Sequence, residues 1–185
     1  MRCKAQWTVR RATTTVEAAI VLPVALFLLL GLFVGALGVF RYQETAHIAR
    51  ETARFATVHG GQYAKDEAAA IQSGSQPNVD KAYLTNLAKG MAIGLDPNFL
   101  QVTVTMTVLP PASTAPSTAT FDWDDTANNL QRSPYSVWTN SSLNPPKNIE
   151  LENMVAVTVS YQWSPEFYLV GPITLSSTAV MPMSH

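Results

Sequence analysis

Residues 18–40 read AAIVLPVALFLLLGLFVGALGVF and contain no charged side chain. At about 1.5 Å per residue, a helix of these 23 residues spans the roughly 30 Å hydrocarbon layer of a bilayer. A cleavable secretory signal would have an apolar region of only about 7–15 residues. Here the helical pattern instead continues into RYQETAHIARETARFATV at 41–58. The sequence therefore predicts a membrane span at 18–40 that is not removed as a secretory signal, within a helix that reaches Val58.

Charges on either side of the apolar run predict its orientation. Four basic residues and no acid lie in the first eleven positions: Arg2, Lys4, Arg10 and Arg11. After the run, Arg41 is balanced by Glu44. The positive-inside tendency places the N-terminus in the cytoplasm and residues 41–185 outside it. Pro23 lies inside the run, removes one helix hydrogen bond, and predicts a kink there.

Composition limits the possible classes of protein. The chain has 185 residues and a formal net charge of −1, which suits one modest domain plus an anchor. No basic stripe is present, so a nucleic-acid partner is not expected. The only cysteine, Cys3, lies in the basic leader, so an intramolecular disulfide is impossible.

The region after the long helix is predicted to mix short helices and strands. His59, Gly60 and Gly61 break the helix, and a second helical piece is expected at 63–71. After a loop at 73–78, Asn78 or Asp80 is expected to cap a helix that runs to about Ile93 and stops at Gly94. Residues 96–98 then form a turn.

Three segments alternate apolar and polar residues with the period of a strand: 101–109, 154–163 and 173–181. Their threonines suggest one polar face and one face packed on helices. The predicted fold is α+β, with a long membrane-spanning helix followed by a small antiparallel sheet packed on helices. The expected organisation is a leader at 1–12, a helix at 13–58 and an extracytoplasmic domain at 59–185.

Residues 110–150 are rich in Pro, Ser, Thr and Asn, and are interpreted as a surface insertion. Four aromatic residues argue against complete disorder: Phe121, Trp123, Tyr135 and Trp138. They indicate either an additional hairpin that supports the fold or an exposed recognition patch, and the hairpin is the simpler interpretation.

Small residues recur at steps of three or four along the long helix, with Tyr42 filling one gap. They are Gly31, Gly35, Gly38, Ala46, Ala49, Ala53 and Ala56. This spacing keeps them on one helix face, where small side chains let another helix approach closely. Two interpretations remain open, because the alanines can also pack on the sheet of the same chain.

Candidate sites for chemistry are few. His47, His59 and His185 lack nearby ligands at metal-binding spacing, and His47 with Glu51 resembles a surface pair. Asp122, Asp124 and Asp125 begin like a calcium loop, but Ala127 and Ser133 replace its glycine and final glutamate. No metal, cofactor, catalytic residue or small-molecule substrate is therefore expected.

The segment RRATTTVEAAIVLPVALFLLLG at 10–31 carries a family resemblance. A basic leader, a small residue, four residues, Glu, and then an apolar run with VLP resemble the N-terminus of TadE-like pseudopilins of tight-adherence (Flp-type) pili. HIARETARFATVHG and the C-terminal MVAVTVSYQW…GPITLSSTAVMP are also similar to that family. Ala12 and Ala18 stand where the family usually has Gly and an aromatic residue.

The resemblance implies processing by a prepilin peptidase. The cut would fall between Ala12 and Thr13, which makes Glu17 the fifth residue of the mature chain. In pilin-like assemblies this carboxylate is thought to pair with the N-terminal amine of a neighbouring subunit. Without cleavage, Glu17 would be only an acid at the start of a helix.

The leading hypothesis is a minor pilin-like subunit that acts by assembly and is not an enzyme. Its implied partners are the membrane, the prepilin peptidase, other pilin-like subunits and the pilus assembly platform. It would lie in the cytoplasmic membrane or in a pilus. The alternative is an uncleaved, signal-anchored binding module outside the cytoplasm.

Overall fold

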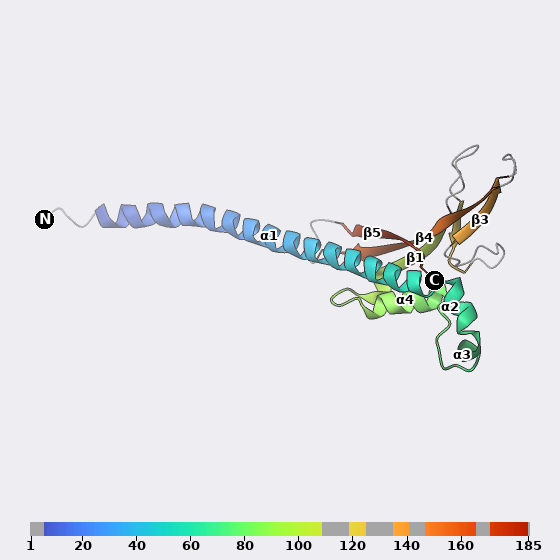
Figure 1. Ribbon diagram of the computed structural model, residues 1–185. Coiled ribbons are helices and arrows are strands. Elements are labelled where there is room, and N and C mark those ends of the chain that lie inside the picture. The colour runs from blue at the N-terminus through green and yellow to red at the C-terminus, as the bar shows by residue number, and fades with distance from the viewer. Residues whose placement is uncertain (1–5, 109–118, 125–134, 141–146, 166–170, 185) are drawn as a thin grey trace. The chain divides into compact units, whose positions relative to one another are not determined.

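The computed structural model describes residues 6–108, 119–124, 135–140, 147–165 and 171–184. The chain divides into two compact units, Met1–Phe40 and Arg41–His185. The helices are α1 (Gln6–Val58), α2 (Gly61–Asp66), α3 (Ala68–Gln72), α4 (Lys81–Gly90) and the 3-10 helix η1 (Pro97–Phe99). The strands are β1 (Leu100–Val108), β2 (Ala119–Asp122), β3 (Tyr135–Asn140), β4 (Lys147–Trp163) and β5 (Ile173–Pro182) (Figure 1).

Helix α1 supplies the whole regular structure of the first unit and continues into the second. Helix α1 continues without interruption through Pro23. The kink expected at Pro23 stays a prediction. Helix-forming Leu and Ala are frequent in the apolar run, and no glycine pair or second proline divides it.

The five strands form one antiparallel sheet in the order β2-β1-β4-β3, with β5 also paired to β4. Strand β4 is the centre, because β1 pairs along residues 153–161 and β5 along residues 154–163. The register places Val104 opposite Val157, and Val157 opposite Ala179. The α+β fold predicted from the sequence, with a small antiparallel sheet after a long helix, is confirmed.

Burial alternates along the central strand as the sequence pattern predicts. Val155, Val157 and Val159 are fully buried, whereas the residues between them are partly exposed. On the opposite face, Thr158 and Thr178 lie side by side, with their hydroxyl oxygens 2.9 Å apart. Successive side chains of a strand point to opposite faces, so one face forms the core and the other presents hydroxyls to solvent.

The end of α1 and helix α4 pack on the apolar face of the sheet. The rings of Phe55 in α1 and Tyr83 in α4 stack with centroids 5.9 Å apart. At the end of the chain, the backbone N–H of Ser184 donates to the carbonyl oxygen of Thr57 at 3.1 Å. Leu84 and Ala88 of α4 are fully buried, and α4 contacts β1. The second unit is therefore a layer of helices on a sheet.

Several boundaries differ from the predictions. The piece expected at 63–71 is two helices, because Glu67 (φ −98°, ψ 14°) leaves the helical conformation between α2 and α3. Helix α4 ends at Gly90, earlier than the predicted Ile93. Gly94 has φ +85°, a left-handed conformation that glycine adopts without steric cost. Asp80 is the capping residue, and its carboxylate accepts from the Tyr83 N–H at 2.7 Å.

The insertion at 110–150 contributes strands to the sheet. Strand β2 pairs with the end of β1, and β3 pairs with the first part of β4, which begins at Lys147. The second predicted strand, 154–163, therefore begins too late, because β4 begins at Lys147. Trp123 is fully buried, and Tyr135 and Trp138 lie in β3, which forms a hairpin with β4. A recognition role for these aromatic residues stays a prediction. Residues 109–118, 125–134 and 141–146 lie outside the described residues.

Two buried threonines on α1 give a test of this packing. The hydroxyl of Thr45 donates to the Arg41 carbonyl at 2.8 Å, but the hydroxyl of Thr52 has no hydrogen-bond partner among the described residues. A buried hydroxyl without a partner carries an uncompensated desolvation cost. We expect Thr52→Val to raise the free energy of unfolding by about 1 kcal/mol. The measurement is denaturant unfolding of the full chain in detergent micelles.

Thr45→Val is the matched control, because it makes the same change where a hydrogen bond exists. It should leave stability unchanged or lower it. A Thr52→Val protein that is less stable than Thr45→Val would contradict the arrangement of α1 described above.

Candidate functional site

The exposed apolar surface of α1 is the most extensive candidate site among the described residues. From Thr14 to Phe40, every side chain is exposed or only partly covered, and Leu28 and Leu32 are 70% and 75% exposed. By length and composition, α1 can cross a membrane. Large apolar side chains rarely cover a surface in contact with water in this way, so the surface requires a lipid or protein environment.

The predicted processing and pairing residues lie at the start of this surface. Ala12 and Thr13 are within α1, and Glu17 follows one helical turn after Thr13 with an exposed side chain. Pro23 is also exposed. No functional role of these residues is tested by their placement, and each remains a prediction.

The small-residue stripe divides into two parts. Gly31 and Gly35 have open space around them, because a Cβ atom added at either position would meet nothing within 4 Å. In contrast, Ala49, Ala53 and Ala56 are fully buried within the second unit, and Ala46 is partly buried. The three alanines are covered by their own domain, as the intramolecular interpretation expects. Only the glycine part, with Gly38 partly exposed, leaves room for another helix.

Arg41 marks the change between the two parts of α1. Its guanidinium carbon lies 5.2 Å from the centroid of the Trp163 ring, at the end of β4. A cation over the face of an indole ring is attracted to the ring electrons. Four residues later, Thr45 is fully buried. The burial of α1 in the second unit therefore begins within about one turn after Arg41.

The candidate metal ligands are not gathered into a site. No group of three or more His, Cys, Asp or Glu that could hold an ion occurs among the described residues. His47 is exposed, and the ring of His59 stacks on Phe55 with centroids 3.9 Å apart. Glu51 forms its ion pair with Arg54, at 3.4 Å. His185 and Asp125 lie outside the described residues.

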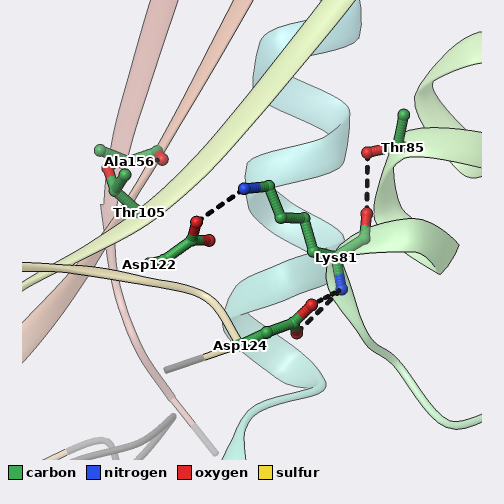
Figure 2. Close-up of polar contacts among 6 residues, drawn as sticks. All are labelled: Lys81, Thr85, Thr105, Asp122, Asp124 and Ala156. Carbon is green, nitrogen blue, oxygen red and sulfur yellow. Dashed lines mark hydrogen bonds and ion pairs between the residues drawn. The ribbon is translucent and has the colours of Figure 1, made fainter. Parts of the chain in front are cut away.

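Asp122 and Asp124 instead hold β2 to the start of α4 (Figure 2). The ammonium of Lys81 lies 2.7 Å from an Asp122 oxygen, and the Lys81 backbone N–H donates to Asp124 at 3.0 Å. Between the two acids, the Trp123 indole N–H donates to the Val79 carbonyl at 3.1 Å. We call these four residues, Lys81, Asp122, Trp123 and Asp124, the β2–α4 lock. Sequence reasoning missed it, because the partners are more than 40 positions apart.

The lock has a modest electrostatic component. The hydrogen bond from Lys81 holds the pKa of Asp122 below its usual value of 3.8, against an opposing effect of partial burial. A carboxylate with a lowered pKa stabilises the fold above its unfolded-state pKa, and this contribution is lost as the pH falls through the folded-state pKa. Because Asp122 is about half exposed (52%), water screens the pair and keeps the contribution small.

The family comparison supports the resemblance seen in the sequence. The model of the TadE family, described as TadE-like protein, matches residues 12–54. The match includes the predicted processing site, Glu17, the whole apolar run and the first turns of the buried part of α1. The TadE-like resemblance is thereby confirmed for this segment, and the TadE-like class is one of structural pilus components, without a catalytic role of its own. The curated proteins gave no match, and neither did the solved structures.

The lock can be tested at Asp124. Its carboxylate accepts from a backbone N–H in the first turn of α4, which otherwise lacks an intrahelical partner. We expect Asp124→Ala to lower the free energy of unfolding by about 1 kcal/mol, as the loss of a capping side chain does. Asp124→Asn keeps an acceptor oxygen and should cost less. Equal stability of wild type and Asp124→Ala in denaturant unfolding would contradict this role.

Proposed function

We propose that the chain is a minor pseudopilin of a tight-adherence pilus, processed by a prepilin peptidase and acting by assembly through α1. The observation that carries the proposal is the TadE-like match at 12–54, on a helix whose side chains from Thr14 to Phe40 are exposed. The leader holds the N-terminus in the cytoplasm, and the second unit lies outside. Its partners are other pilin-like subunits and the assembly platform.

Cleavage before Thr13 gives Glu17 a role. The new terminal amine is positive, and the Glu17 carboxylate lies near the apolar run, where a lone charge is costly. Pairing the carboxylate with the amine of a neighbouring subunit offsets much of that cost, and removing one partner leaves the other charge unpaired. The pair therefore favours insertion of a new subunit in one register along its neighbour.

The open glycines supply the second contact. Gly31 and Gly35 are one turn apart, with nothing beside them in the single chain. Glycines at this spacing let two helix backbones approach closely, which increases van der Waals contact where lipid gives no hydrophobic driving force. Assembly by this route uses only α1 of the first unit, because the alanines at 49–56 are covered.

The first experiment identifies the N-terminal residue of the protein isolated from membranes, with and without prepilin peptidase. We expect a start at Thr13 only when the peptidase is present. Glu17→Gln should then be processed and yet reduce incorporation into complexes, because the amine loses its charged partner. Glu17→Asp keeps the charge and is the matched control. A start at Met1 under both conditions would favour the uncleaved anchored module.

Gly35→Leu tests the helix contact separately from processing. Because the space around Gly35 is open in the single chain, the substitution should leave the unfolding of the protein unchanged. We expect it to reduce cross-linking to other pilin-like subunits, and pilus output, by about tenfold, the effect of losing roughly 1.4 kcal/mol of contact. Leu29→Ala, a change at an exposed residue on the opposite side of the helix from the glycines, is the control. Unchanged cross-linking would contradict close packing at Gly35.

A further inference from the structure

Exposed large apolar side chains persist in the second unit, where water would be the expected surroundings. Six occur among its described residues: Tyr42, Val58, Ile93, Phe99, Ile173 and Val180. Ile93 and Phe99 are 79% and 52% exposed, and both belong to the connection between α4 and β1. Such side chains often mark a contact surface when they gather.

Four of the six gather at one end of the unit. Ile173 pairs with Trp163, which contacts Arg41, and Tyr42 follows Arg41 in the chain. Phe99 belongs to η1, which contacts β4 and leads into Leu100, the partner of Tyr161. The connection from α4 to β1, which carries Ile93, lies at the same end (Figure 1). We call Tyr42, Ile93, Phe99 and Ile173 the apolar rim.

Covalent connection places the rim next to the predicted membrane span. Consecutive Cα atoms are about 3.8 Å apart, and Arg41 directly follows Phe40, the last residue of the apolar run at 18–40. The contact between Arg41 and Trp163 then fixes the adjoining end of the sheet near that point. The opposite end of the unit, where Thr57 meets Ser184, is farther along by sixteen residues of helix, or about 24 Å.

The polar groups of the rim suit a lipid headgroup layer. Arg41 and Lys89, in the last turn of α4, are cations with long apolar stems, which can reach phosphate groups while the stems stay in apolar surroundings. The carboxylate of Asp96 accepts from the Asn98 backbone N–H at 2.9 Å and from its side-chain amide at 3.0 Å. This acid is therefore compensated within its own turn. Aromatic residues with basic neighbours are typical of the membrane–water boundary.

We propose that the apolar rim, with Arg41 and Lys89, rests on the outer surface of the phospholipid bilayer before assembly. This inference depends on the membrane anchoring in the proposed function and adds a second contact to it. Lipid is favoured over a protein partner because Arg41 and Tyr42 follow directly in the chain after a segment that can cross a membrane by length and composition. The rim then limits how far the second unit can tilt away from the membrane.

The test uses the full chain in phosphatidylcholine vesicles, with fluorescent labels at single cysteines in a Cys3→Ser background. Ile93→Cys and Phe99→Cys report on the rim. Val58→Cys and Val180→Cys are matched controls, because these side chains are also apolar and exposed but lie away from it. Lipids brominated near the headgroup quench labels at that depth. We expect a fluorescence loss at 93 and 99 that is several-fold larger than at 58 and 180.

A label introduced by Leu28→Cys separates failure of the inference from failure of the proposed function. Quenching at 28 by deeply brominated lipid, with equal losses at 93, 99, 58 and 180, would overturn the rim contact and leave the anchor intact. No quenching at 28 would refute the anchor itself. If labels at 93 and 99 become shielded only in membranes that contain the other pilus subunits, the rim faces protein and the lipid contact is wrong. Thermal unfolding of each labelled protein checks that the fold is kept.

Discussion

The burial of one face of α1 inside the second unit is the constraint on which that unit depends. Ala49, Ala53 and Ala56 have no exposed surface, and neither do Val155, Val157 and Val159 of β4. Alanine on the helix and β-branched valine on the strand allow the two backbones to pack closely, with few voids. A larger side chain at Ala49, Ala53 or Ala56 would displace the residues packed around this face of α1. Interiors at this density tolerate such insertions poorly.

The two parts of helix α1 thus have surfaces of different composition. Before Phe40 its surface is apolar around the whole circumference, which suits lipid or a helix bundle. After Arg41 one face is buried and the other carries Arg50, Glu51 and Arg54, which suits water. The change falls at the boundary between the two compact units. Composition along one continuous helix therefore encodes both a segment that can cross a membrane and part of the core of the second unit.

The sequence predicts the features that depend on local periodicity. The apolar run, nearly all of β1 and β5, the second part of β4, and a helix cap at Asn78 or Asp80 follow from patterns within about ten residues. It does not predict β2, which is four residues long, or the start of β4 at Lys147, because pairing with distant strands decides both. The β2–α4 lock was missed for the same reason. A Trp between two acids in a polar insertion was the available signal, and it was interpreted only as part of a hairpin or patch.

The two interpretations of the small-residue stripe could not be separated from sequence, since Gly and Ala at helical spacing serve both. Burial separates them by position, and this has a consequence for assembly. The last turns of α1 are fastened at both ends, by Arg41 on Trp163 and by Thr57 on Ser184. Withdrawing this part of α1 into a bundle would expose Ile48, Ala49, Ala53 and Ala56 and the residues packed on them, at a cost of about 25 cal/mol for each Å² of apolar surface. In the proposed assembly, a subunit that leaves the bilayer therefore keeps the second unit folded and exchanges only the lipid around residues 14–40 for neighbouring helices.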